Sequence, residues 1–261
     1  RKAVYCQVLY GIHAISAISK FPSIKESLMF SIAKLLPFSI LRRRYTKFLK
    51  KADIVIANSK ITANLLHILY GIECDKVVYP PIDTDIFKPQ KIQKTTILLY
   101  LGSHAGDTDD KFAREICRIL KDKDFEVLVM GNKILQEKLK LEFNVRQILN
   151  VSDEELARIY SGCKLTICPQ KWEMFGYVPV ESMSCGTPVL SFDCMGLGET
   201  IINGKTGLLA KNKQEFLEIL DSTLKNEEIR IDQNFTRKYI EENFSINVSI
   251  EKLEGVLREI R

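Results

Sequence analysis

The sequence predicts an α/β fold in which helices cover both faces of a parallel β-sheet. Short runs of consecutive apolar residues alternate with longer stretches whose apolar residues recur at helical spacing. Strands that are apolar on both faces are typical of parallel sheets buried between helices. The chain has 261 residues, 46% apolar and 27% charged, as in an ordinary globular protein of one large or two small domains.

The individual elements follow from these patterns in chain order. The predicted strands are Ala3–Leu9, Ile54–Ala57, Lys76–Tyr79, Ile97–Leu101, Glu126–Met130, Leu165–Cys168 and Pro188–Phe192. Helices are predicted between most of them, with examples at Ser59–Leu69, Lys111–Leu120, Asp153–Tyr160 and Gln214–Leu224. Beyond Phe235 the pattern is helical throughout.

Two consecutive prolines mark the boundary between domains. Tyr79-Pro80-Pro81-Ile82-Asp83 interrupts the alternation of strands and helices. Too few strands precede it for a complete doubly wound domain, whereas enough follow it. We predict a partial first domain with its crossover over residues 1–88, a complete domain over 89–235, and C-terminal helices over 236–261 that return toward the first domain. Because the chain begins with Arg1 and enters a strand at once, we expect earlier strands in the natural protein.

The charge, the cysteines and the apolar stretches of the chain argue against several classes of protein. The net charge of +5 is too small to indicate nucleic acid. The seven cysteines contain no C-x-x-C pair, which favours reduced cysteines in a cytoplasmic protein, and no zinc site is predicted with only three histidines. The longest apolar stretch, Leu28 to Leu41, contains Lys34 and Pro37, so neither a signal peptide nor a membrane span is predicted.

The segment 25–51 has two interpretations. Its apolar residues recur at helical spacing and are followed by a basic cluster that includes Arg42, Arg43 and Arg44. The apolar residues either pack within the first domain or, with the basic cluster, form a peripheral contact with the cytoplasmic face of a membrane. Both interpretations stay open at this point.

The segment from Pro169 to Thr200 carries the candidate chemistry. A strand ends at Cys168, and Pro179 favours a helix start shortly afterwards. In an open parallel sheet, ligands bind beyond the carboxyl ends of the strands, where the first N–H groups of a helix suit a phosphate. Glu173 and Glu181 bracket this turn, and each carboxylate can accept hydrogen bonds from hydroxyl groups of a sugar or a ribose.

A second strand-to-turn unit follows directly. After Phe192 come two glycines and a Glu-Thr pair, the candidate ligand-binding residues Gly198, Glu199 and Thr200 among them. Two neighbouring turns of this kind are suited to holding a diphosphate.

The segment Glu173–Val189 resembles the signature of glycosyltransferase family 4, a group of retaining enzymes with the GT-B fold. That pattern has Glu, any residue, Phe-Gly, a second Glu eight positions after the first, and then Gly-x-Pro-Val. Other segments are similar to the family's interdomain crossover and to its next strand and turn: Ala52–Ser59, Val78–Asp83, Phe87–Pro89 and Gly204–Leu209. The resemblance covers nearly the whole chain. It implies a GT-B-type fold with one complete Rossmann-like C-terminal domain and a partial N-terminal Rossmann-like domain.

The resemblance also implies a function. Such enzymes transfer a sugar from a nucleoside diphosphate sugar to an acceptor, here a glycan or a lipid-linked glycan. It implies that Glu173 is catalytic beside the donor sugar and that Glu181 binds the ribose. The remaining residues of that turn would line the donor site: Phe175, Gly176, Tyr177 and Val178. The family generally needs no metal or other cofactor, because basic side chains and helix dipoles stabilise the leaving diphosphate. The similarity around Tyr79–Pro81 favours mannose as the sugar.

The chain departs from the family pattern at two places. The family has Gly-Arg after the first strand of its second domain, whereas Gly102 is followed here by Ser103, with Lys111 near the expected position of a phosphate-binding lysine. Gln7 stands where the family often has a histidine near the donor sugar, and its amide still suits a sugar hydroxyl. Two functions therefore stay open: a glycosyltransferase, or a non-catalytic fragment that binds a sugar nucleotide.

Overall fold

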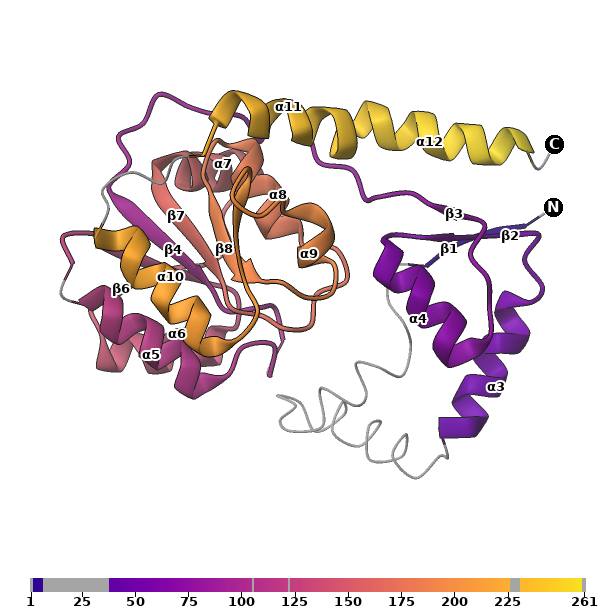
Figure 1. Cartoon of the computed structure of the whole chain (residues 1–261), viewed down its shortest axis with the longest axis horizontal. Coiled ribbons are helices and arrows are strands. Elements are labelled where there is room, and N and C mark those ends of the chain that lie inside the picture. Colours follow the sequence, from indigo (N-terminus) through magenta and orange to yellow (C-terminus); the bar gives the residue numbers. More distant parts are fainter. Residues whose placement is uncertain (1, 7–37, 105, 122, 226–230, 260–261) are drawn as a thin grey trace. The chain divides into compact units, whose positions relative to one another are not determined.

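The computed structural model describes residues 2–6, 38–104, 106–121, 123–225 and 231–259 (Figure 1). Gln7 and residues 25–37 of the predicted membrane element lie outside the described residues. The chain divides into two compact units, one formed by residues 1–80 with 249–261 and the other by residues 81–248.

The first unit contains a three-stranded parallel sheet. Its order is β1 (Ala3–Cys6), β2 (Ile54–Ala57) and β3 (Lys76–Val77). Two helices, α3 (Phe38–Leu49) and α4 (Lys60–Tyr70), contact each other, and α4 also contacts β2. The buried cluster of this unit comprises Cys6, Leu49, Val55, Leu66, Tyr70 and Ile72.

The C-terminal helix contributes to the first unit. On α12 (Ile246–Glu259), Val256 belongs to a buried cluster with Ile56 and Val78. Lys76 Nζ lies 3.0 Å from the carboxylate of Glu259.

The second unit is built on a six-stranded parallel sheet. Its strands are β4 (Thr96–Tyr100), β5 (Glu126–Met130), β6 (Val145–Ile148), β7 (Cys163–Cys168), β8 (Val189–Phe192) and β9 (Gly207–Ala210). They lie in the order β6-β5-β4-β7-β8-β9. This is a doubly wound arrangement in which the strand order reverses between β4 and β7, and ligands bind at such a reversal.

Helices cover both faces of this sheet (Figure 1). One layer holds α5 (Asp110–Lys121), α6 (Lys133–Glu142) and α10 (Lys213–Lys225). The other holds α7 (Asp153–Gly162), α8 (Tyr177–Ser184), the single turn α9 (Leu197–Thr200) and α11 (Gln233–Phe244). The connections from β4 to β6 therefore run over one face and those from β6 to β9 over the other, as expected for a doubly wound sheet.

The apolar runs form strands because both of their faces are covered. Ile97, Leu98 and Leu99 on β4 are all fully buried. The face toward α5 and α10 carries an aromatic cluster in which the rings of Phe112 and Phe216 lie 5.4 Å apart. Continuous apolar sequence is thus the expected composition of the central strands.

The predicted fold class is confirmed, with additions at the edges of the sheet. Strand β6 was not predicted, because two of its four residues, Arg146 and Gln147, are polar and it pairs with β5 alone. Helix α6 was not among the helices singled out from the sequence. The helix predicted to start near Pro179 forms as α8, with Pro179 in its first turn.

No helix in the described part of the chain is both long enough and apolar enough to cross a membrane.

One arginine ties together three segments of the second unit. The guanidinium of Arg237 on α11 donates 2.6 and 2.7 Å hydrogen bonds to the backbone oxygens of Phe87 and Thr84. It also donates to the hydroxyl of Ser184 at the end of α8, at 2.9 Å, and to Glu241 at 2.6 Å. Several donors in one plane are needed to satisfy these acceptors together, which only a guanidinium offers.

We predict that Arg237→Lys destabilises the second unit by about 2–4 kcal/mol, since one ammonium group cannot replace the set of hydrogen bonds to Thr84, Phe87, Ser184 and Glu241. The measurement is the free energy of unfolding in denaturant. The matched control is Arg258→Lys, because the exposed Arg258 pairs, among the described residues, with Glu254 alone, at 3.3 Å. Equal stabilities of the two variants would contradict the role of Arg237.

Candidate functional site

The site lies where the strand order of the second unit reverses. The loops that follow β4 and β7 leave the same edge of the sheet at this point. The side-chain amide of the buried Gln170 donates to the backbone oxygen of Tyr100 and, at 3.3 Å, to the hydroxyl of Thr108. Gln170 therefore fixes the two loops against each other.

Glu173 sits in a turn that directs backbone amides at its own carboxylate. The amide of Met174 donates to Glu173 Oε1 at 3.1 Å, and the amides of Phe175 and Gly176 donate as well. Burial raises the pKa of Glu173 above its ordinary value, the amides oppose that rise, and the negative charge of Asp107 adds to it. The carboxylate is thus fixed in direction and partly withdrawn from water.

Glycine is required at two positions of this turn. Gly176, which precedes α8, has φ of 92°, a left-handed conformation that other residues rarely adopt. A Cβ on Gly196 would lie 2.6 Å from the backbone nitrogen of Phe175, so only glycine allows the loop after β8 to approach this closely. The amide of Gly196 donates to the backbone oxygen of Glu173 at 2.8 Å, which joins the two loops.

Glu181 projects from the middle of α8 toward a buried tyrosine. The hydroxyl of Tyr160 on α7 donates to Glu181 Oε2 at 2.9 Å. Burial raises the pKa of Glu181 to about 7, the Tyr160 hydrogen bond opposes that rise, and the charge of Asp153 adds to it. Near neutral pH this carboxyl group is therefore close to the midpoint of its titration.

The loop after β8 supplies packing as well as exposed groups. The side chain of Thr200 is buried and its hydroxyl donates to the backbone oxygens of Gly196 and Phe175, at 3.2 and 3.4 Å. Gly198 is exposed and Glu199 is half-buried. Thr200 therefore holds the turn together, whereas Gly198 is accessible to a ligand.

The loop after β4 carries fewer positive charges than the resemblance implies. Gly102 is buried, and the exposed Ser103 shares a 2.9 Å hydrogen bond with the hydroxyl of Tyr100. Asp107 Oδ2 accepts from the amide of His104 at 2.8 Å. Lys111 is exposed in the first turn of α5, where its amide donates to Asp109 at 2.9 Å. In the described residues the structure shows no contact between the Lys111 side chain and Glu173.

The structure thus brings some of the predicted residues together and not others. Glu173, Gly176 and Phe175 form one tight turn with the loop that contains Thr200. The Phe175 side chain is buried between the rings of Tyr177 and Phe244, at 5.2 and 5.7 Å, so only its backbone faces the site. Tyr177 is exposed and Val178 half-buried, both at the start of α8.

Three residues of the site carry no signal in the sequence. Gln170 and Tyr100 connect the loops after β7 and β4, and Tyr160 holds Glu181. In the sequence, Tyr160 occupies an apolar position of a predicted helix. In the structure its ring is fully buried, as that position predicts. Only the pairing of α7 with α8 in space reveals its hydroxyl as a partner of a carboxylate.

Metal-binding side chains are not clustered in the described part of the chain. It holds no group of three or more histidine, cysteine, aspartate or glutamate side chains arranged to bind a metal ion.

Comparison with known proteins places this site in a family. Residues 81–242, more than half of the chain, match the family described as glycosyl transferases group 1. The chain therefore belongs to the group 1 glycosyltransferases. An uncharacterized glycosyltransferase of Methanocaldococcus jannaschii is 31% identical over 150 residues, which cover 54% of this chain and 42% of that protein. D-inositol 3-phosphate glycosyltransferase of Rhodococcus erythropolis is 28% identical over 189 residues, which cover 62% and 43%.

Solved structures confirm the predicted GT-B type of fold. Sucrose-phosphate synthase of Thermosynechococcus elongatus matches with a TM-score of 0.72 and 20% identity, covering 84% of this chain and 61% of that one. HepE of Anabaena, solved with UDP and glucose, matches with a TM-score of 0.69 and 17% identity, covering 83% and 66%. The chain spans less than half the length of the two curated relatives named above.

The contact between Tyr160 and Glu181 leads to a prediction about titration. Tyr160→Phe removes a hydrogen bond that favours the ionised carboxylate, so the pKa of Glu181 rises further above about 7. Asp153→Asn removes a nearby negative charge, so the same pKa falls. Carbon NMR of the Glu181 carboxyl group during a pH titration measures both shifts.

The two variants move the pKa in opposite directions, which separates a local electrostatic effect from general loosening of the fold. Tyr239→Phe serves as the control, because Tyr239 packs against Phe244 and makes no described contact with Glu181. An unchanged pKa of Glu181 in Tyr160→Phe would contradict the role given to this hydrogen bond.

Proposed function

We propose that this chain forms the donor-binding part of a retaining, metal-independent glycosyltransferase. It transfers a sugar from a nucleoside diphosphate sugar to a glycan or lipid-linked acceptor. The observation that carries the proposal is the pair of partly buried carboxylates, Glu173 and Glu181, at the point where the strand order reverses. One lies in the loop before α8 and the other within that helix.

In this proposal the two carboxylates have different tasks. Glu173 is the catalytic residue beside the donor sugar, where its orientation by three backbone amides positions it toward the sugar hydroxyls. Glu181 accepts hydrogen bonds from the ribose of the nucleotide, and the Tyr160 hydroxyl holds it in place. Gln7, in the first unit, is proposed as a further partner of the sugar.

The diphosphate has a matching place at the start of α8. No side chain caps the first amides of that helix, so these amides can donate to an anion. Gly198, Glu199 and Thr200 border the same turn. Gly102 and Ser103 belong to the loop after β4, and Lys111 to the first turn of α5 that follows it. Helix amides in this position stabilise the leaving diphosphate without a metal ion.

Relatives support the choice of ligand class. HepE was solved with UDP and glucose, and the R. erythropolis relative is named for glycosyl transfer to D-inositol 3-phosphate. We propose a hexose as the transferred sugar, with mannose favoured by the resemblance around Tyr79–Pro81, and a cytoplasmic location. Contact of residues 25–51 with a membrane surface is part of the same proposal.

Substitution of each carboxylate tests whether Glu173 is catalytic and Glu181 binds the ribose. Glu173→Gln in the full-length enzyme is expected to abolish transfer while leaving nucleotide affinity nearly unchanged. Glu181→Gln is expected to weaken nucleotide binding by about ten- to a hundredfold, the value of a hydrogen bond to a charged group. Calorimetry measures affinity, and release of the nucleotide diphosphate measures transfer.

The control is Glu115→Gln, since Glu115 is an exposed glutamate on α5 outside the site. Near-normal transfer by Glu173→Gln would refute its catalytic role. Equal nucleotide affinities of Glu181→Gln and Glu115→Gln would refute the ribose contact.

A second function is favoured by one specific observation. Ser103 stands where the family has an arginine for the diphosphate, and its hydroxyl is bonded to Tyr100. A non-catalytic fragment that binds a sugar nucleotide fits this loss of positive charge. Nucleotide-sugar binding in calorimetry without turnover in a parallel assay supports this second function, whereas turnover excludes it.

A further inference from the structure

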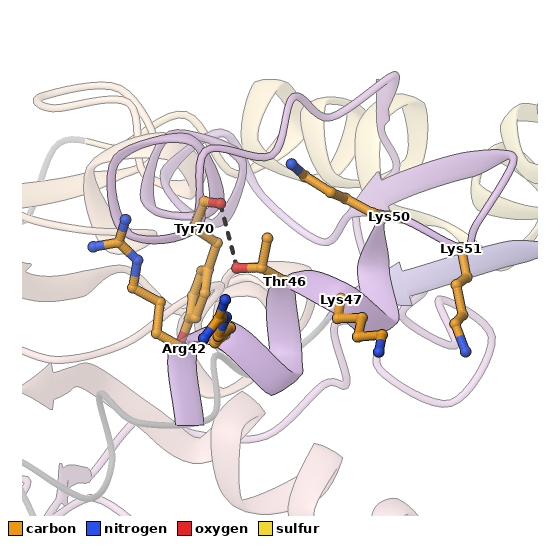
Figure 2. Close-up of a pocket in the computed structure, with 7 residues that line it drawn as sticks. Arg42, Thr46, Lys47, Lys50, Lys51 and Tyr70 are labelled. Atoms are coloured by element: carbon orange, nitrogen blue, oxygen red, sulfur yellow. Dashed lines mark hydrogen bonds between the residues drawn. The ribbon is translucent and has the colours of Figure 1, made fainter. Parts of the chain in front are cut away.

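The first unit contains a concave pocket on α3, within the segment 25–51 for which a membrane contact is proposed (Figure 2). Its volume is about 860 Å³. Its lining residues are Arg42, Arg43, Thr46, Lys47, Lys50, Lys51 and Tyr70. Five of these seven carry a positive charge and none is acidic. Figure 2 shows the cations projecting from α3 and the turn that follows it.

The floor of the pocket is ordered by contacts between α3 and α4. The hydroxyl of Thr46 donates to the backbone oxygen of Tyr70 at 3.4 Å. Tyr70 is 3% exposed, and its ring meets that of Tyr45 edge-to-face at 4.8 Å. Burial raises the pKa of Tyr70, so its phenol stays neutral and does not offset the surrounding positive charge. The backbone that carries the cations is therefore held in place by the packing of α3 against α4.

These positive charges are not balanced within the described part of the chain. The structure shows no ion pair between a described carboxylate and any of the five cations that line the pocket. Residues 42–51 contain six basic residues and no acidic one, which exceeds the net charge of +5 of the whole chain. The rest of the chain is thus slightly negative, and the positive charge is concentrated here.

The stability of α3 does not account for this concentration. Lys47 lies in the last turn, where the helix dipole favours a cation, but Arg42 and Arg43 lie nearer the opposite end. Arg43 and Lys47 are four residues apart, a spacing at which like charges destabilise a helix. A bound anion removes that repulsion, whereas the helix alone gains nothing from it.

The pocket lies near the amino ends of the strands of its sheet. Ligands of parallel sheets bind at the opposite edge, beyond the carboxyl ends of the strands. Helix α3 leads through Lys50 and Lys51 into the start of β2. Helix α4 begins after the carboxyl end of β2, and Tyr70 marks its far end. Both walls of the pocket therefore lie near the amino ends of the strands, away from the carboxyl edge.

We propose that this pocket binds a phosphorylated anion, either the headgroup of an anionic lipid or a phosphate group of a soluble molecule. Arginine and lysine are the residues that bind phosphate oxygens, and several cations around one concavity suit a ligand with more than one negative charge. The pocket acts as an anchoring site and takes no part in sugar transfer. The lipid-headgroup source rests on the membrane contact of residues 25–51 in the proposed function and identifies the side chains that make it. Sugar transfer is tested separately at Glu173, so failure of one proposal is distinguishable from failure of the other.

Pyrophosphate and lipid vesicles are the two probes that test it. The pocket variant carries Lys47→Gln and Lys50→Gln, and the matched control carries Lys121→Gln and Lys140→Gln. All four lysines are exposed, and both variants lose the same charge. Binding of pyrophosphate to the chain is measured by calorimetry. Binding of vesicles is measured by co-sedimentation, with phosphatidylcholine alone compared with phosphatidylcholine plus phosphatidylglycerol.

For the correct ligand source, the pocket variant is expected to bind about tenfold more weakly than the control, since it loses two charge-assisted contacts. Weaker pyrophosphate binding assigns a soluble ligand, and weaker binding to anionic vesicles assigns a lipid headgroup. The donor site of the other unit also attracts pyrophosphate, so the difference between the two variants is the readout. Equal affinities of both variants for both probes, or no binding of either probe, overturn the proposal.

Discussion

The reversal of strand order between β4 and β7 is the constraint on which the second unit depends. All six strands are parallel, so the loops after β4, β7 and β8 leave the same edge of the sheet. The helices that follow β4 and β7, α5 and α8, lie on opposite faces of the sheet. They leave backbone groups exposed at the carboxyl edge between them. The hydrogen bonds of Gln170 then define the spacing of the first two loops. A binding site at this edge follows from the topology before any particular side chain is considered.

Close contact between backbones explains why the motif is so compact. Gly196 lies directly against the peptide of Met174 and Phe175, and Thr200 bonds to the backbone on both sides of that contact. The glycines and Thr200 therefore fix the direction in which Glu173 points. A residue predicted to contact a ligand can also hold the loops together. Thr200 is such a residue, since its side chain is buried.

The sequence predicts the central strands of the second unit. It does not predict the edge strand β6 or the contacts between side chains of different helices. Continuous apolar runs identify β4, β5, β7 and β8, because burial on both faces excludes polar residues from them. The edge strand β6 was not predicted, because its polar residues interrupt the apolar run. The carboxylates Glu173 and Glu181 are visible in the sequence through their motif. Tyr160 is not, because contact between α7 and α8 is a property of the fold and not of local spacing.

The electrostatics of the candidate donor site fit an anionic ligand despite its two acidic groups. Two ionised carboxylates would repel a diphosphate, yet burial raises the pKa of both Glu173 and Glu181. With a pKa of about 7, Glu181 is only partly ionised near neutrality, which reduces that repulsion. Hydroxyl groups of a bound sugar or ribose would stabilise the ionised form in place of water. In the proposed function, the uncapped amides of α8 supply the positive potential that Ser103, standing in place of the arginine of the family pattern, does not.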